Sequence, residues 1–124
     1  PQKLVMEESS FLQYMAIQIL SIFLIYFIAE TSRLYPALPF IPRMCTENYR
    51  IPNSEYVVKK GDSLIIPVFG IHRDPQYYPN PDVFNPENFS HDAKMSRPAG
   101  CFLSFGDGPR NCIGMLCLCG SICI

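Results

Sequence analysis

Hydrophobic residues are concentrated in one long run near the beginning of the chain. Sixteen of the 19 residues from Phe11 to Ala29 are apolar, and the 21 residues from Ser9 to Ala29 carry no charge. A helix of this length, rising about 1.5 Å per residue, is long enough to cross a lipid bilayer. The pattern predicts a helix that continues through 30–33 and ends before Pro36, because a residue that precedes proline disfavours helical backbone.

Prolines dominate the remainder of the chain. Eleven of the 12 prolines lie between Pro36 and Pro109, which excludes a helical bundle there, because an interior proline removes a helix hydrogen bond and clashes with the preceding turn. Two short apolar runs, 56–58 and 63–68, flank a turn that contains Gly61, and this spacing predicts a β-hairpin. We therefore expect an α+β fold, mainly irregular and helical, with one small hairpin.

Two further features follow the predicted hairpin. Asp74 and Pro75 predict a single helical turn, with Asp74 as its cap and Pro75 at the first helical position. Residues 77–90 alternate prolines with aromatic side chains, which indicates an irregular, proline-punctuated coil.

Charge and composition narrow the function classes. The 124 residues contain 10 Lys+Arg and 11 Asp+Glu, a formal net charge of −1. This balance gives no electrostatic footprint for nucleic acid, so we expect no nucleic-acid partner. An apolar content of 48% excludes general disorder, which requires low hydrophobicity and high net charge. The length corresponds to one small domain at most.

The six cysteines do not form the pattern of a disulfide framework. Three of them fall within the last eight residues, and Cys117 and Cys119 are separated by a single residue. The first ten residues are polar and acidic and lack the basic segment of a secretory signal. We therefore expect a reducing compartment rather than a disulfide-stabilised scaffold.

The segment Phe105–Gly114 carries the most chemical information. Gly106 and Gly108 permit backbone with positive φ, and the proline that follows stiffens the loop. A tight loop of this kind directs backbone N–H groups at a sulfur, and such hydrogen bonds stabilise a thiolate and tune a metal bound to it. Arg110, two residues before Cys112, places a permanent cation beside any carboxylate on a bound group. From these residues alone, a buried and inert cysteine in a turn remains open.

The order of residues in this loop resembles the haem-binding loop of the cytochrome P450 family, Phe-x-x-Gly-x-Arg-x-Cys-x-Gly. The matching positions are Phe105, Gly108, Arg110, Cys112 and Gly114. Four other elements follow the family's order: a Glu-x-x-Arg pair, the expected hairpin, a His-x-Asp-Pro element and an aromatic meander. They lie at Glu30/Arg33, 56–68, His72–Pro75 and 82–89. The resemblance covers about residues 30–115. Within the family, this sequence is similar to the microsomal, insect-type detoxification branch.

The resemblance implies a haem cofactor. It makes Cys112 the metal-binding residue, as the proximal thiolate ligand of the haem iron. Arg43, His72 and Arg110 match positions that hold the haem propionates. The full set of expected cofactor-binding residues is Arg43, His72, Phe105, Gly108, Arg110, Cys112 and Gly114.

Other roles follow from the same resemblance. Phe105 is expected to pack near the sulfur side of the haem, and Gly114 to let the following helix approach the ring. Glu30 and Arg33 are expected to form a buried structural pair. Phe40 lies in a stretch that is expected to contact substrate on the distal side.

The implied activity is that of a haem-thiolate monooxygenase, which inserts one oxygen atom of O2 into a hydrophobic small molecule. The implied electron donor is an NADPH-dependent reductase, and the implied location is the cytosolic face of the endoplasmic reticulum membrane. The family fold has several hundred residues, so we expect this chain to be a C-terminal, haem-binding portion that is inactive alone. Two alternatives remain: a non-catalytic truncated remnant, and a metal-binding or electron-transfer module built on Cys112, Cys117, Cys119 and Cys123.

We divide the chain into an abnormal hydrophobic leader (1–29), a cytochrome P450 portion (30–115) and an atypical cysteine-rich tail (116–124). The spacing from Leu12–Met15 to Glu30 exceeds the family pattern by roughly three turns. The leader is therefore open to three interpretations: a membrane span, a helix that faces a core outside this chain, or translated non-coding sequence, which also applies to the tail. Asn88 stands where many family members have arginine, which leaves open the third partner of the Glu30–Arg33 pair.

Overall fold

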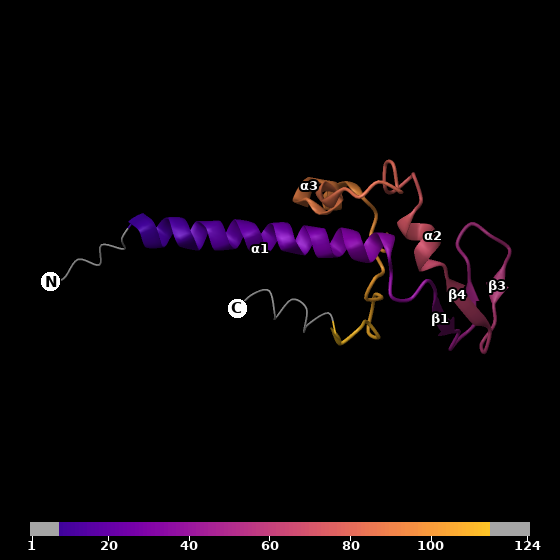
Figure 1. Ribbon diagram of the computed structural model, residues 1–124. Coiled ribbons are helices and arrows are strands. Elements are labelled where there is room, and N and C mark those ends of the chain that lie inside the picture. Colours follow the sequence, from indigo (N-terminus) through magenta and orange to yellow (C-terminus); the bar gives the residue numbers. More distant parts are fainter. Residues whose placement is uncertain (1–7, 115–124) are drawn as a thin grey trace.

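The computed structural model describes residues 8–114, with side chains from Phe11 onward. The chain contains three α-helices, one 3-10 helix and four short strands within this range (Figure 1). In chain order they are α1 (Glu8–Leu34), β1 (Ile41–Met44), β2 (Tyr49–Arg50), β3 (Val57–Val58), β4 (Ser63–Ile66), α2 (Val68–His72), η1 (Pro86–Phe89) and α3 (His91–Ser96). The mixture of helix and strand, with long irregular connections, agrees with the fold class expected from the sequence.

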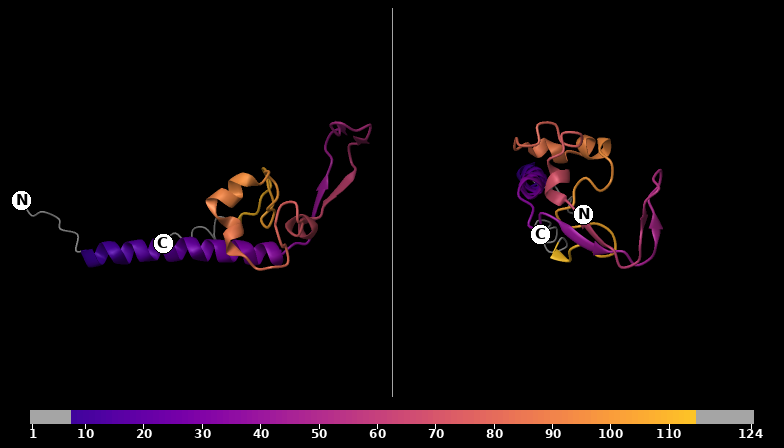
Figure 2. Two further views of the ribbon diagram at one scale, coloured as in Figure 1. Left: turned by 90° about the horizontal axis from the view of Figure 1, so that it is seen from above. Right: turned by 90° about the vertical axis from the view of Figure 1, so that its right-hand side faces the viewer.

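The long helix α1 ends at Leu34, which confirms the stop predicted from Pro36. Its last turns contact α2 and η1, whereas its first half projects away from the rest of the molecule (Figures 1 and 2). An 18-residue window within Phe11–Leu34 has a mean hydropathy of 2.0. This stretch is long enough and apolar enough to cross a membrane. The core helix of a soluble protein can meet the same two criteria. Its large apolar side chains from Phe11 to Ile25 are 38–67% exposed.

The strand pairing differs from the predicted hairpin, and the prediction that 56–58 pairs with 63–68 is wrong. The strand β4 pairs with β1, with Ile41 opposite Ile66, and β3 pairs with β2, with Arg50 opposite Val57. Both ladders are antiparallel, and the residue pairing of the first ladder continues in step in the second. Together the four strands form a single long ribbon that is interrupted in the middle. The expected turn around Gly61 exists, but it lies at this interruption, where Gly61 N donates to Cys45 O at 2.8 Å.

The segment after β4 forms a helix that the sequence did not predict. The strand ends at Ile66 rather than continuing to Val68, because Pro67 supplies no donor for the ladder. A short helix, α2, begins instead, with Ile71 N donating to Pro67 O at 3.0 Å. The turn predicted at Asp74 is confirmed, because Asp74 O accepts a hydrogen bond from Tyr78 N at 3.0 Å.

The helices η1 and α3 lie inside or directly after the segment that we expected to be coil. Each begins with a side-chain cap: Asn85 accepts from Glu87 N, and Ser90 accepts from Ala93 N. Such caps satisfy backbone donors that a helix start leaves without partners.

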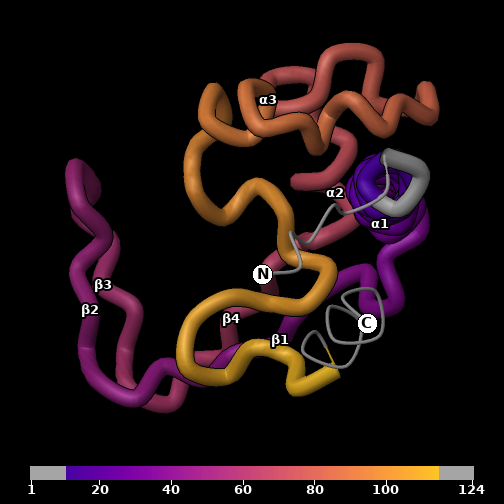
Figure 3. Tube along the Cα trace, turned by 90° about the vertical axis from the view of Figure 1, so that its left-hand side faces the viewer, coloured from indigo at the N-terminus to yellow at the C-terminus, as the bar shows by residue number. Residues whose placement is uncertain are grey.

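The buried apolar core is small and lies between the ribbon and α2. It consists of Ile41, Val68 and Leu103, with Ile66 and Ile71 packed against it. Figure 3, which looks along α1, shows β2 and β3 far from α1, while the last described segment runs between α3 and β1. The core therefore fixes the chain just before the cysteine-containing loop.

Candidate functional site

The loop from Phe105 to Cys112 is closed by backbone hydrogen bonds. Cys112 N donates to Phe105 O at 2.7 Å, and Asn111 N donates to Gly108 O at 3.2 Å. Gly106 and Gly108 have φ of 74° and 82°, a region in which a side chain is strained. The two glycines are therefore required by the shape of the loop, and this shape sets the direction of Cys112.

Cys112 carries a free and exposed thiol. A Cβ added at Gly114 would lie 3.4 Å from Cys112 Sγ, at the limit of close contact, so glycine keeps the space beside the sulfur open. Within residues 8–114, no three histidine, cysteine or acidic side chains gather into a metal-binding group. In this part of the chain, a metal at Cys112 would have that thiol as its protein ligand, while the cysteines of the predicted tail cluster, 117, 119 and 123, lie outside the described residues.

One arginine lies next to this loop and a second belongs to it. The Arg43 guanidinium, on β1, approaches Gly106, with Nη2 3.9 Å from the position of an added Cβ. Arg110 belongs to the loop itself and is exposed. The ion pairs found across the described residues are Glu30–Arg33 and Arg73–Asp82, so neither Arg43 nor Arg110 is neutralised by a carboxylate there. Both remain available to an anionic group.

His72 lies in the core rather than at an open surface. Leu103 N donates to His72 Nε2 at 2.8 Å, and Nδ1 lies 3.2 Å from Arg33 O. Because Nε2 accepts, Nδ1 carries the proton and donates. Burial lowers the pKa of His72 below 6.5, the hydrogen bond to Arg33 O opposes this shift, and the Arg33 charge adds to it. The imidazole is neutral and has no free nitrogen for a propionate.

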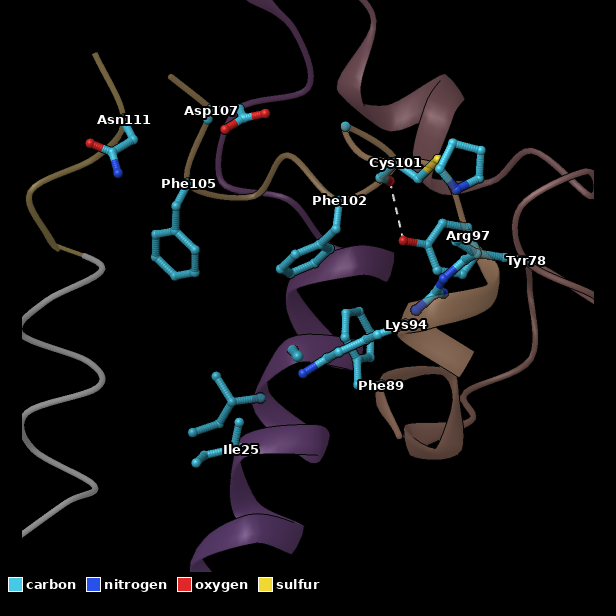
Figure 4. A pocket seen from close by; sticks show the side chains of 15 residues that line it. Ile25, Tyr78, Phe89, Lys94, Arg97, Cys101, Phe102, Phe105, Asp107 and Asn111 are labelled. Atoms are coloured by element: carbon cyan, nitrogen blue, oxygen red, sulfur yellow. Dashed lines mark hydrogen bonds between the residues drawn. The ribbon is translucent and has the colours of Figure 1, made fainter. Parts of the chain in front are cut away.

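The two aromatic residues singled out from the sequence lie in different surroundings. Phe105 is half-buried and lines a cavity of about 510 Å³ between α1, α3 and the cysteine loop, together with Ile25 and Phe102 (Figure 4). Phe40 is 52% exposed, lies before β1 and does not line this cavity. The structure thus brings Arg43, Phe105, Gly108, Arg110, Cys112 and Gly114 to one loop region and leaves Phe40 and His72 apart from it.

Glu30 and Arg33 form a fully buried, bidentate ion pair. Arg33 Nε and Nη2 donate to the two carboxylate oxygens of Glu30, each at 2.8 Å. The remaining nitrogen, Nη1, donates to His72 O and Pro81 O, both at 2.8 Å. Because these donors are satisfied by carbonyls from the last residue of α2 and from the segment after it, the pair ties the end of α1 to both.

The third partner of this pair is Asn88. Asn88 Nδ2 donates to Glu30 Oε1 at 3.1 Å, and the same oxygen accepts from Asn85 N at 2.9 Å. The Asn88 amide thus connects η1 to the Glu30 carboxylate. Sequence reasoning missed Tyr78, which is fully buried against Arg33, because one aromatic residue in a proline-rich coil gives no periodic signal.

Comparison with known proteins identifies a family. The cytochrome P450 family model matches residues 4–116. Cytochrome P450 6a9 of Drosophila melanogaster is 51% identical over 89 residues, which are 71% of this chain and 18% of that protein. Two Blattella germanica proteins, cytochrome P450 6k1 and cytochrome P450 9e2, are 44% and 48% identical over 88 residues, or 71% and 70% of this chain and 17% and 16% of theirs.

The chain therefore spans less than a fifth of the length of these relatives. The family match nevertheless extends over most of the chain and includes the cysteine loop, the buried Glu30–Arg33 pair and the segments between them. The chain belongs to the cytochrome P450 family, and the relatives that it resembles are insect members of that family.

Proposed function

We propose that this chain supplies the thiolate side of a haem site in a monooxygenase, with Cys112 as the iron ligand. The observation that carries the proposal is the closed loop from Phe105 to Cys112, which presents an exposed thiol beside a glycine. Family membership supports haem as the cofactor. A thiolate-ligated haem supplies the chemistry that activates O2 so that one oxygen atom enters an apolar substrate.

The residues around the loop fit such a group. A flat macrocycle needs open space at the sulfur, which Gly114 leaves, and its two carboxylates need cations, which Arg43 and Arg110 offer without competing carboxylates in the described chain. Phe105 and Gly108 shape the loop that holds the sulfur in place. His72 does not fit a propionate-binding role, because the backbone occupies both of its nitrogens, and we propose a structural role for it instead.

The wider reaction belongs to a protein of the length of the relatives. We propose O2 and a hydrophobic small molecule as substrates and an NADPH-dependent reductase as electron donor. Phe40 is proposed to contact the substrate, which its 52% exposure before β1 would permit. The cytosolic face of the endoplasmic reticulum is proposed as the location. The apolar helix α1 is compatible with a membrane there by length and composition.

Activity is proposed to require the rest of such a protein. The thiol of Cys112 is open to solvent here, and a thiolate–haem bond needs an enclosing pocket to exclude water. The 124 residues alone are therefore expected to be inactive.

The test is oxygen incorporation by a full-length protein that carries this sequence. With ¹⁸O2, NADPH and a reductase, the product of an apolar substrate is expected to contain one ¹⁸O atom, and Cys112→Ser is expected to abolish this product. Cys45→Ser is the matched control, because Cys45 is a free thiol between β1 and β2 and is not part of the loop. Unlabelled product, or full activity of Cys112→Ser, would contradict the proposal.

A further inference from the structure

Tyr78 contacts two guanidinium groups with its ring. Its side chain is fully buried, and its ring centroid is 5.0 Å from Arg33 Cζ and 4.4 Å from Arg97 Cζ. Its hydroxyl donates to Cys101 O at 3.1 Å, the bond drawn as a dashed line in Figure 4. Tyr78 thus links both cations to the segment that leads into the cysteine loop.

Arg97 closes this arrangement into a ring of contacts. It follows α3 directly, and its guanidinium donates to Asn88 O. The Asn88 side chain donates to Glu30, which is paired with Arg33. Within the described residues no carboxylate pairs with Arg97. Its partners are therefore aromatic rings and a carbonyl, a setting in which a planar guanidinium is favoured over an ammonium.

The segment held by this ring has two anchor points. Cys101 O accepts from Tyr78, and two residues later Leu103 N donates to His72 Nε2. Both residues are buried, and the glycine-containing loop begins at Phe105, two residues after Leu103. The position of Cys112 therefore depends on anchors that precede it by about ten residues and that Tyr78 and His72 supply.

We propose that Arg97 is a positioning residue for the cysteine loop: its guanidinium packs over the Tyr78 ring, as that of Arg33 does, so that the Tyr78 hydroxyl fixes Cys101. The proposal rests on the proposed function only in taking Cys112 as the iron ligand. The Glu30–Arg33 pair and Arg97 then act on one side chain from two elements, α1 and the end of α3.

Amide hydrogen exchange in the full-length protein tests the positioning itself. The probes are the Leu103 and Cys112 amides, which are bonded to His72 Nε2 and Phe105 O. Arg97→Gln is expected to speed exchange at both amides by roughly five- to tenfold, the effect of losing one stabilising contact. Lys94→Gln is the matched control: Lys94 lies on α3, the helix that Arg97 follows, over the rings of Tyr26 and Phe89 at 5.6 and 6.0 Å. It is expected to leave exchange unchanged.

A second variant covers the case in which Arg97→Gln does not fold. Tyr78→Phe keeps the ring against both guanidiniums and removes only the bond to Cys101, so Leu103 is expected to exchange faster while the amides of α1 keep their protection. Unchanged exchange at Leu103 in Tyr78→Phe, or in a folded Arg97→Gln, would overturn the proposal.

The spectrum of the reduced, carbon-monoxide-bound haem protein separates positioning from general stability. At equal haem content, Arg97→Gln is expected to show a smaller thiolate-shifted band than the unsubstituted protein, and Arg97→Lys to restore part of it. A full band in Arg97→Gln contradicts the positioning role. A missing band in the unsubstituted protein refutes the proposed function instead, and the exchange rates then still decide the role of Arg97.

Discussion

At the scale of single residues, the main feature is a pair of fully buried charged side chains, Glu30 and Arg33. Glu30 and Arg33 are three apart on one helix, a spacing that by itself describes an ordinary surface pair. Their burial depends on segments far away in sequence, because the carbonyls of His72 and Pro81 and the amide of Asn88 complete their hydrogen bonds. The sequence was therefore enough to locate the pair. The hydrogen-bond partners of the pair could be identified only from the folded structure.

The first prediction concerns Arg33. Arg33→Ala would leave the Glu30 carboxylate buried without its cation, which costs about 3–5 kcal/mol in the free energy of unfolding. Chemical denaturation of the full-length protein measures this loss. Arg50→Ala, at an exposed arginine on β2, is the control and is expected to change the free energy by less than about 0.5 kcal/mol. Equal stability of the two variants would contradict the buried ion pair.

The second prediction is a pH dependence that arises from His72. Burial holds the folded-state pKa of His72 below the ordinary value of 6.5. Below pH 6.5 the unfolded chain therefore binds a proton that the folded chain does not. Stability from this group is complete above pH 6.5 and decreases as the pH falls towards the folded-state pKa, by at most about 1.4 kcal/mol per pH unit.

Denaturation curves between pH 5 and 8 measure this slope. His72→Gln is expected to remove it, whereas His91→Gln, at the exposed second histidine, is expected to retain it. A slope that survives in His72→Gln would assign the effect to another group.

At the scale of elements, the helix end was easier to predict than the strand pairing. Pro36 stops α1 through local backbone geometry, so one residue suffices for the prediction. Pairing depends on non-local partners, and the partner of β4 contains Pro42, which conceals its strand character. Gly61 was interpreted as the end of a hairpin, but the structure places it in the middle of the ribbon.

The third prediction tests this position of Gly61. Its φ is 94°, and no atom lies within 4 Å of an added Cβ, so Gly61→Ala introduces backbone strain without a steric clash. We expect a loss of about 1–2 kcal/mol in the free energy of unfolding. Gly70→Ala, inside α2, is the matched control, because an added Cβ there makes only an ordinary contact with Pro67 at 3.8 Å. Equal effects of the two substitutions would contradict the strained turn.

At the scale of the whole molecule, the described residues combine a small core with a long helix whose first half is exposed. The core of Ile41, Val68 and Leu103 supports the cysteine loop, whereas the apolar side chains from Phe11 to Ile25 lie exposed. A membrane, a further part of a longer protein and an origin in non-coding sequence each account for that exposure. The genomic sequence around codons 16–30 and 115–124 separates the last interpretation from the other two.

The cysteine loop was the part of the site that sequence could specify most fully. Its shape depends on local features, two glycines with positive φ and one backbone bond from Cys112 to Phe105, so its residues lie close together in the chain. His72 shows the limit of this reasoning. Its role depends on what surrounds the ring, and its two backbone partners come from positions 33 and 103.

The central claim is that Cys112 is the thiolate ligand of a haem iron. The carbon-monoxide difference spectrum of the reduced full-length protein tests it most directly, because thiolate ligation moves the main haem band strongly to longer wavelength. We expect the shifted band in the unsubstituted protein and in Cys117→Ser and Cys119→Ser, no shifted band in Cys112→Ser, and none from the 124-residue chain with added haemin. A shifted band that persists in Cys112→Ser, or that disappears in a tail-cysteine variant, would contradict the assignment.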